Sequence, residues 1–117
     1  MSNTEPSVFT RIVAREIPAE IVFESDTVIA IKDIAPKAPV HLLVIPKTQQ
    51  YRNVAELAAG DPALLAEVVA VAQSLADERA DSEFRLVFNT GESAGQTVFH
   101  VHAHVLGGQF TEGSLAE

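Results

Sequence analysis

The chain has 117 residues, which is enough for one hydrophobic core and too few for two domains of ordinary size. Apolar residues make up 47% and charged residues 21%, close to the averages for folded globular proteins, so disorder throughout the chain is excluded. Eight Lys and Arg against sixteen Asp and Glu give a net charge of −8, which opposes binding to nucleic acid.

The sequence contains no cysteine, so we expect neither a disulfide framework nor a thiolate metal site, in agreement with a reducing cytoplasm. Residues 1–18 contain four charged side chains and no apolar run of the kind that a secretion signal needs. The longest apolar helical stretch, residues 62–76, includes Glu67 and is short for a bilayer span. We therefore expect a cytoplasmic protein without a membrane partner.

The first half of the chain predicts a short helix and three strands. Phe9, Ile12 and Val13 have helical spacing, which predicts a helix over 7–15. Two β-branched runs, 21–24 and 27–31, are separated by a short turn and should pair antiparallel. A third apolar run, 41–45, should be a strand that stops at Pro46.

The second half predicts a long helix and two further strands. Asp61 followed by Pro62 is a typical helix start, and the apolar spacing predicts a helix over 62–80. Strands over 84–89 and 98–106 should flank a glycine-containing loop at 90–95. The sequence therefore predicts one α+β domain over 1–117, with a core over about 9–108, a mainly antiparallel five-stranded sheet and a loosely held polar tail over 109–117.

Three of the four histidines lie at alternate positions, His100, His102 and His104. In a strand, this spacing places the three imidazoles on one face, roughly 6.6 Å apart. The residues between and beside them, Phe99, Val101, Ala103 and Val105, should then face the core. The pattern predicts a row of titratable rings on the outer face of a rigid element.

Three interpretations of this row are open from the residues alone. A solvated strand face is the simplest, because polar and apolar residues alternate in any half-buried sheet. A zinc or iron site is the second, which His41 could complete, although the segment and its flanks offer no carboxylate except Glu92. Nucleophilic catalysis on a phosphate is the third, because the loop 89–97 offers backbone N–H groups, an amide and hydroxyls to phosphate oxygens.

The segment 100–106 reads His-Val-His-Ala-His-Val-Leu, which resembles the signature of the histidine triad (HIT) superfamily. Further similarity to its Hint-like branch, the purine nucleoside phosphoramidase type, lies in 15–18, 33–36, 38–41, 44–47 and 89–108. The resemblance implies a HIT-like homodimer in which two five-stranded sheets join. It also implies hydrolysis of purine nucleoside phosphoramidates at the α-phosphorus through a covalent nucleotidyl-histidine, with AMP released from adenosine substrates and with no cofactor.

The resemblance also implies roles for individual residues. His102 would attack phosphorus, His104 would bind phosphate oxygens, and His100 and His41 would support the proton network. Asp33 would accept both ribose hydroxyls, although it could equally be a turn acceptor. The phosphate and leaving group would be held by Asn89, Gly95, Gln96 and Thr97. The purine slot would be formed by Phe9, Ile12, Ile31, Ile34 and Leu43, of which Phe9 and Ile12 could instead belong to the core.

Some positions depart from the family pattern. Many bacterial relatives have a Cys-x-x-Cys at Ser7 and Thr10 and bind structural zinc with histidines matching His41 and His100, so no structural zinc is expected here. Lys32 replaces a frequent histidine, and the residues after Gly108 lack the ending of animal Hint proteins. The alternatives are a nucleotide-binding scaffold with slow turnover, a dinucleoside polyphosphate hydrolase, and, more distantly, a metal-dependent oxidoreductase.

Overall fold

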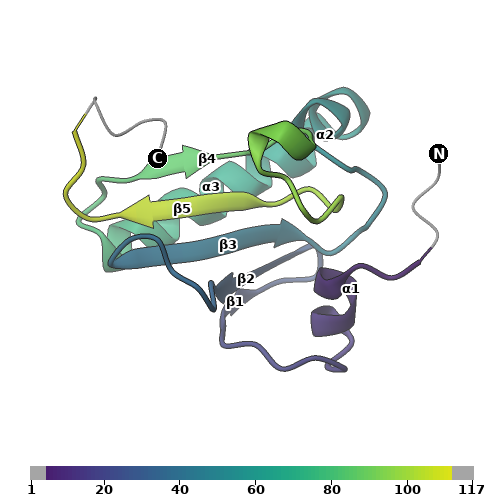
Figure 1. The fold of residues 1–117 in the computed structure, drawn as a ribbon, viewed down its shortest axis with the longest axis horizontal. Helices are drawn as coiled ribbons and strands as arrows, with labels where there is room; N and C mark the ends of the chain where they lie inside the picture. The colour runs from purple at the N-terminus through teal and green to yellow at the C-terminus, as the bar shows by residue number, and fades with distance from the viewer. Residues whose placement is uncertain (1–4, 112–117) are drawn as a thin grey trace.

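The computed structural model describes residues 5–111, and Figure 1 shows its helices and strands. In chain order they are α1 (Val8–Val13), β1 (Ile21–Glu24), β2 (Val28–Lys32), β3 (Val40–Pro46), α2 (Val54–Gly60), α3 (Pro62–Arg79), β4 (Arg85–Val87), the 3-10 turn η1 (Glu92–Ala94) and β5 (Ala103–Gly107).

The five strands form one sheet in the order β1-β2-β3-β5-β4, and every neighbouring pair is antiparallel. The long helix α3 lies behind this sheet in Figure 1, whereas the short helix α1 lies near its opposite face at one end. The predicted α+β fold with a five-stranded antiparallel sheet is confirmed.

The alternation of side chains along the strands produces two apolar clusters, one on each face of the sheet. Beneath α2 and α3 lies the main core, to which the strands contribute Val28, Ala30, Leu42, Val44, Ala103 and Val105. On the other face lies a smaller cluster of Phe9, Ile12, Ile29, Ile31, Leu43 and Ile45. Because α1 covers only part of this second face, polar side chains there remain accessible.

Helix caps determine where the helices begin. The side chain of Ser7 accepts a hydrogen bond from the backbone N–H of Thr10 at the start of α1, and Asp61 accepts one from Leu64 at the start of α3. Helix α2 was not predicted, although Asn53 accepts from the N–H of Glu56 and so caps it. An Asn followed three residues later by Glu is a recognisable start signal for that helix.

The predicted strand over 98–106 is wrong in its first half, because β5 begins only at Ala103. Its pairing with β3 ends at Val44, and the next residues of β3 lead to Pro46, which has no N–H with which to extend the ladder. The chain bends before the strand, and Phe99 is 41% exposed instead of facing the core. From Val101 onwards the predicted alternation holds, since Val101 is 2% exposed.

The first residues of the predicted tail are anchored to the sheet. The guanidinium carbon of Arg85 lies 4.3 Å from the ring centre of Phe110, and the same guanidinium donates a hydrogen bond to the carbonyl of Thr111 at 2.6 Å. The rest of the predicted tail, residues 112–117, lies outside the described part of the chain. Among the described residues, none of the helices combines the length and apolarity needed to cross a bilayer.

Candidate active site

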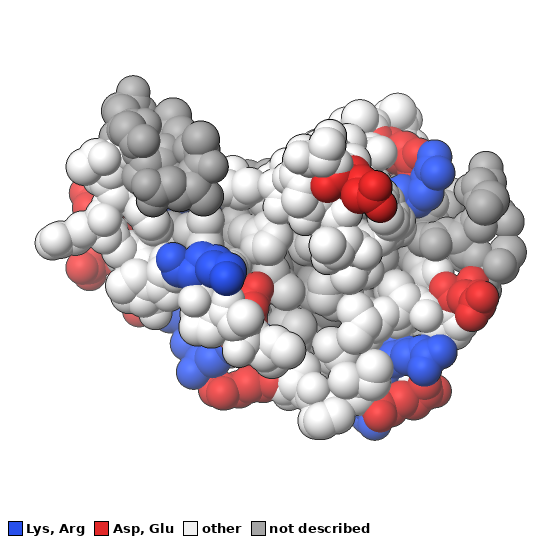
Figure 2. All heavy atoms as spheres, viewed as in Figure 1, with Lys and Arg blue, Asp and Glu red and all other residues white. Residues whose placement is uncertain are grey.

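The functional candidates gather on the sheet face that α3 does not cover. Paired residues of an antiparallel sheet share a face, so the pairing of Leu43 with His104 places this histidine on the side of the smaller apolar cluster. Figure 2 shows this side, which is hollowed near its centre, with most charged side chains around the margin. A cavity of about 550 Å³ on this side is lined by Asp33, Ala35, Lys37, His41, Arg85, Val87, Asn89, Ala94, His104 and Leu106.

The hydrogen bonding of His102 leaves one of its ring nitrogens free to act as a nucleophile. Nδ1 lies 2.8 Å from the backbone carbonyl oxygen of His100, which can only accept a hydrogen bond. The proton of the neutral ring is therefore on Nδ1, and Nε2 has a lone pair. The ring is also fixed by an edge contact with Phe9, whose centre is 4.8 Å away. This arrangement suits attack by Nε2 on an electrophile.

His100 is a buried support for His102 and does not belong to an exposed row of rings. It is fully buried, with Nε2 2.7 Å from the carbonyl oxygen of Pro46 and Nδ1 2.6 Å from the hydroxyl of Ser7. The carbonyl requires a proton on Nε2, so Nδ1 accepts from Ser7. The prediction of three imidazoles on an outer face is wrong for His100, because the N-terminal end of α1 covers it.

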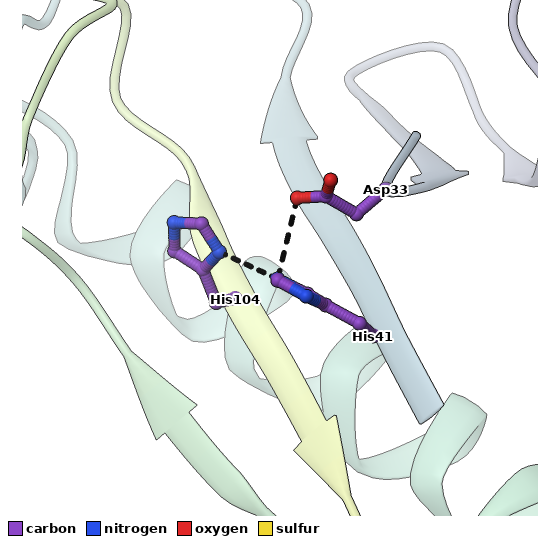
Figure 3. A group of neighbouring side chains, drawn as sticks. All are labelled: Asp33, His41 and His104. Carbon is purple, nitrogen blue, oxygen red and sulfur yellow. Dashed lines mark hydrogen bonds and ion pairs between the residues drawn. The ribbon is translucent and has the colours of Figure 1, made fainter. Parts of the chain in front are cut away.

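Asp33, His41 and His104 form a second hydrogen-bonded group, shown in Figure 3. The backbone N–H of Lys37 donates to Nδ1 of His41 at 2.9 Å, so the proton of neutral His41 is on Nε2. That atom lies 2.9 Å from Nδ1 of His104 and 3.3 Å from Oδ2 of Asp33. Nδ1 of His104 is therefore an acceptor, and its proton is on Nε2, where it can donate to a substrate oxygen or nitrogen.

Burial keeps the histidines of the site neutral. Desolvation lowers the pKa of His41, His100 and His102 below the ordinary histidine value. The same effect, reinforced by the neighbouring imidazoles of His102 and His41, lowers the pKa of His104 to about 4. At neutral pH, His102 can therefore act as a nucleophile without first losing a proton.

Among the described residues, Asp33, His41 and His104 are the group that could hold a metal ion, since one ligand atom from each lies within 4.8 Å of the others. A carboxylate and two neutral imidazoles are ligands that zinc and ferrous iron accept. His102 is not part of this group.

Four of the five residues predicted for the purine slot lie together in the smaller apolar cluster. Phe9, Ile12, Ile31 and Leu43 are between 4% and 8% exposed, whereas Ile29 and Ile45 of the same cluster are fully buried. Among the buried residues of this cluster, the small solvent-accessible surface therefore belongs to the four predicted residues. Ile34 is 96% exposed and is not brought into the cluster.

The backbone N–H groups of Gly91, Gly95 and Gln96 in the glycine-containing loop donate hydrogen bonds within the protein, so these groups stabilise the loop instead of facing a ligand. The N–H of Gly95 donates to the carbonyl of Glu92, and the N–H of Gln96 donates to the carbonyl of Gly91. The buried Gln96 side chain accepts from the N–H of Gly91 and donates to the carbonyls of Arg52 and Val98. Asn89 lines the cavity, whereas Thr97 is exposed outside it.

The positions that correspond to zinc ligands in relatives form a polar network. Ser7 bonds to His100, while both the Thr10 hydroxyl and the Ser7 backbone N–H donate to the side-chain carbonyl of Gln49. His41, which was matched to a zinc-binding histidine of relatives, is not part of this network and lies with Asp33 and His104. Gln49 is the fourth member of this network, with Ser7, Thr10 and His100, and the sequence alone did not indicate it.

Two cations of the cavity were also missed at the sequence level. Lys37 and Arg85 line the cavity with His104. The alternation of strand β4, in which Arg85 and Val87 lie on one face and Leu86 on the other, could have identified Arg85, because Val87 is paired with His104.

Comparisons with known proteins extend over nearly the whole chain. A family profile described as "Scavenger mRNA decapping enzyme C-term binding" matches residues 6–116. An uncharacterized HIT-like protein of Synechococcus elongatus is 46% identical over 107 residues, which are 91% of this chain and 93% of that protein. The purine nucleoside phosphoramidase of Escherichia coli K12 is 38% identical over 107 residues, which are 90% of this chain and 89% of that protein.

Solved structures with the same fold are also similar in sequence. A HIT family hydrolase from Clostridium thermocellum has a TM-score of 0.84 at 44% identity, with 92% of this chain and 94% of that chain covered. A HIT family hydrolase from Legionella pneumophila has a TM-score of 0.85 at 39% identity, with 94% and 98% covered.

The lowered histidine pKa values predict a loss of stability in mild acid. Unfolded histidines gain protons below about pH 6.5, whereas folded His104 stays neutral until about pH 4. The free energy of unfolding, measured by urea denaturation, should therefore fall as the pH is lowered from 7 to 5. His104→Asn should reduce this fall by about 1 kcal/mol, and equal pH dependence in the two proteins would contradict the assignment.

Proposed function

Because the chain belongs to the histidine triad (HIT) family, we propose that it is a nucleotidyl hydrolase acting on purine nucleoside phosphoramidates. The observation that supports this function most directly is the neutral His102 ring, whose Nδ1 donates to the carbonyl of His100 and whose Nε2 has a lone pair. The purine nucleoside phosphoramidase of Escherichia coli, 38% identical, supports the choice of substrate class.

The proposed reaction has two displacements at the α-phosphorus. Nε2 of His102 forms a bond to phosphorus while the P–N bond breaks, and the amine nitrogen leaves with the electron pair and takes up a proton. Water then attacks the nucleotidyl-histidine, which releases the nucleoside monophosphate and restores His102. His104, with its proton on Nε2, is suited to bind phosphate oxygens and to assist proton transfer, and His41 holds that tautomer in place.

The nucleotide should lie across the sheet from the apolar cluster to His104. The purine would contact the accessible edges of Phe9, Ile12, Ile31 and Leu43, with Ile34 at the rim. The ribose would lie at Asp33, whose side chain is 18% exposed. Asn89, which lines the cavity, is suited to hold the phosphate or leaving group, whereas Gly95 and Gln96 are proposed to shape the loop around it.

We expect His102→Ala to lower turnover of an adenosine phosphoramidate by at least about 100-fold while nucleotide binding is kept, because the base and ribose contacts do not involve this ring. Single-turnover kinetics and calorimetric titration with AMP would measure the two effects. Wild-type protein should also show a nucleotidyl adduct on His102 by intact-mass analysis.

This pair of measurements separates the enzyme from a nucleotide-binding scaffold. A variant that retains more than a few per cent of the activity would contradict the assignment of the nucleophile. AMP binding by wild-type protein without turnover of adenosine or guanosine phosphoramidates would instead favour a nucleotide-binding scaffold.

We propose that Asp33 selects ribose over deoxyribose. Its Oδ1 accepts from the N–H of Ala35 at 2.8 Å and its Oδ2 faces His41, yet each carboxylate oxygen can accept a further hydrogen bond. Hydrogen bonds to a charged group contribute roughly 1.5–3 kcal/mol, so kcat/KM should favour the ribonucleotide by roughly tenfold to a hundredfold.

Two substitutions test this role against that of a turn residue. Asp33→Asn keeps an oxygen for the Ala35 N–H, whereas Asp33→Ala removes it. Both should flatten the ribose preference, measured as the ratio of kcat/KM for the two sugars. If both variants slow the two substrates equally, Asp33 is only a turn acceptor.

We also propose that the protein is a homodimer. The strand β4 is at the edge of the sheet, beside the cavity, and an unpaired edge is most safely covered by a symmetry mate. Light scattering at micromolar concentration should give twice the mass of one chain. The mass of a single chain would contradict this proposal.

A further inference from the structure

The cavity extends from His104 away from the nucleophile. The ring centres of His102 and His104 are 5.3 Å apart. Along β5, the next residue after His104 on the same face is Leu106. His104 and Leu106 line the cavity, whereas His102 is not part of its lining. The cavity therefore continues past His104 on the side opposite His102.

The direction of displacement places the leaving group in this part of the cavity. In phosphoryl transfer, the attacking atom, the phosphorus and the departing atom lie roughly in line. A phosphorus atom attacked by His102 and bound by His104 would release its leaving group away from His102. The end of the cavity beyond His104 is thus available to the leaving group, while the apolar cluster around Phe9 is available to the base.

Arg85 lies at this end of the cavity. It is paired with Leu106 in the sheet, two residues along β4 from Val87, which is paired with His104. This separation corresponds to roughly 6.6 Å along the strand, so Arg85 lies beyond the position of the transferred phosphoryl group. The half-buried Arg85 side chain is held by the ring of Phe110 and the carbonyl of Thr111.

The charges of the cavity favour an anion at this end. Lys37 and Arg85 line it, and Asp33 is the one acidic residue of its described lining. Lys37 is adjacent to the site, since its backbone N–H donates to His41. A guanidinium presents its N–H donors in a planar fork, which is the geometry that binds a carboxylate or phosphate. Among the described lining residues, cations therefore outnumber the single acidic residue, whereas the chain as a whole has a net charge of −8.

We propose that Arg85, together with Lys37, selects substrates whose leaving group has a negative charge. The inference rests on the proposed function and adds to it a leaving-group class: amines that also bear a carboxylate or a phosphate. Arg85 is a specificity-determining residue here, because it contacts the departing part of the substrate and not the phosphorus that His102 attacks.

Matched substrates test the proposal. Adenosine 5′-phosphoramidates of β-alanine and β-alaninamide differ in one negative charge, and those of O-phosphoethanolamine and ethanolamine test phosphate in the same way. Wild-type protein should favour the charged member of at least one pair by roughly tenfold in kcat/KM, and the favoured pair identifies carboxylate or phosphate as the preferred anion.

Substitutions then assign the preference to Arg85. Arg85→Gln should bring the ratio close to one, and Arg85→Lys should retain part of it. Arg11→Gln, an exposed site on α1 outside the cavity, removes the same charge from the chain and should keep the wild-type ratio. Light scattering and thermal melting check that each variant keeps its assembly and fold. If Arg85→Gln does not fold, the Arg85→Lys variant provides the test. A ratio of kcat/KM for charged over neutral substrate below that of wild type would then assign the preference to Arg85, and an unchanged ratio would contradict it.

The possible failures are distinguishable. If wild-type protein hydrolyses none of the four substrates, the proposed function fails and this inference fails with it. If it hydrolyses charged and neutral members equally well, only the leaving-group assignment is overturned. Equal slowing of both members by Arg85→Gln would also overturn it, because Arg85 would then act on the phosphoryl group or on the fold.

Discussion

The hydrogen bond from Nδ1 of His102 to the carbonyl oxygen of His100 is the interaction on which the candidate site depends. It fixes the tautomer that leaves Nε2 of His102 with a lone pair. The carbonyl is itself held in place, because the His100 ring is anchored at both nitrogens, by the carbonyl of Pro46 and the hydroxyl of Ser7. The end of strand β3, the N-cap of helix α1 and the candidate nucleophile are therefore one connected unit. A change at the helix cap should reach the nucleophile through His100.

Equal spacing along the chain does not give His102 and His104 equal chemistry. Nδ1 of His102 faces a carbonyl acceptor, whereas Nδ1 of His104 faces the protonated Nε2 of His41. The two rings consequently hold opposite tautomers, and Nε2 is a lone pair in one and a donor in the other. Desolvation lowers the pKa of both rings, so both tautomers persist at neutral pH. A base and a donor are thus placed side by side, with ring centres 5.3 Å apart.

Local patterns predicted the strands and long helix well, and they failed where a tertiary contact decides the outcome. The β-branched runs and the Asp61 cap gave the sheet and α3 closely, while the short helix α2 was missed despite its Asn53 cap. The alternation that placed Val101 in the core could not show that His100 lies beneath α1, because that contact joins residues 93 positions apart. The bracing of the loop by the Gln96 side chain depends on a backbone carbonyl 44 positions away, for the same reason.

Neutral histidines place a constraint on how the site compensates the charge of a nucleotide. Imidazoles that must stay neutral cannot supply positive charge, so the cations of an anion-binding site have to come from other side chains. Burial is the main cause of the lowered pKa of His41, and the positive charge of Lys37, which lines the cavity beside that ring, lowers this pKa further. Asp33 acts in the opposite direction and raises the pKa of His41. Without the charge of Lys37, burial alone would oppose the Asp33 carboxylate, which favours a charged His41. A second proton on this ring would remove the acceptor for the Lys37 N–H. The cation therefore helps to preserve the tautomer of His41, and through it that of His104.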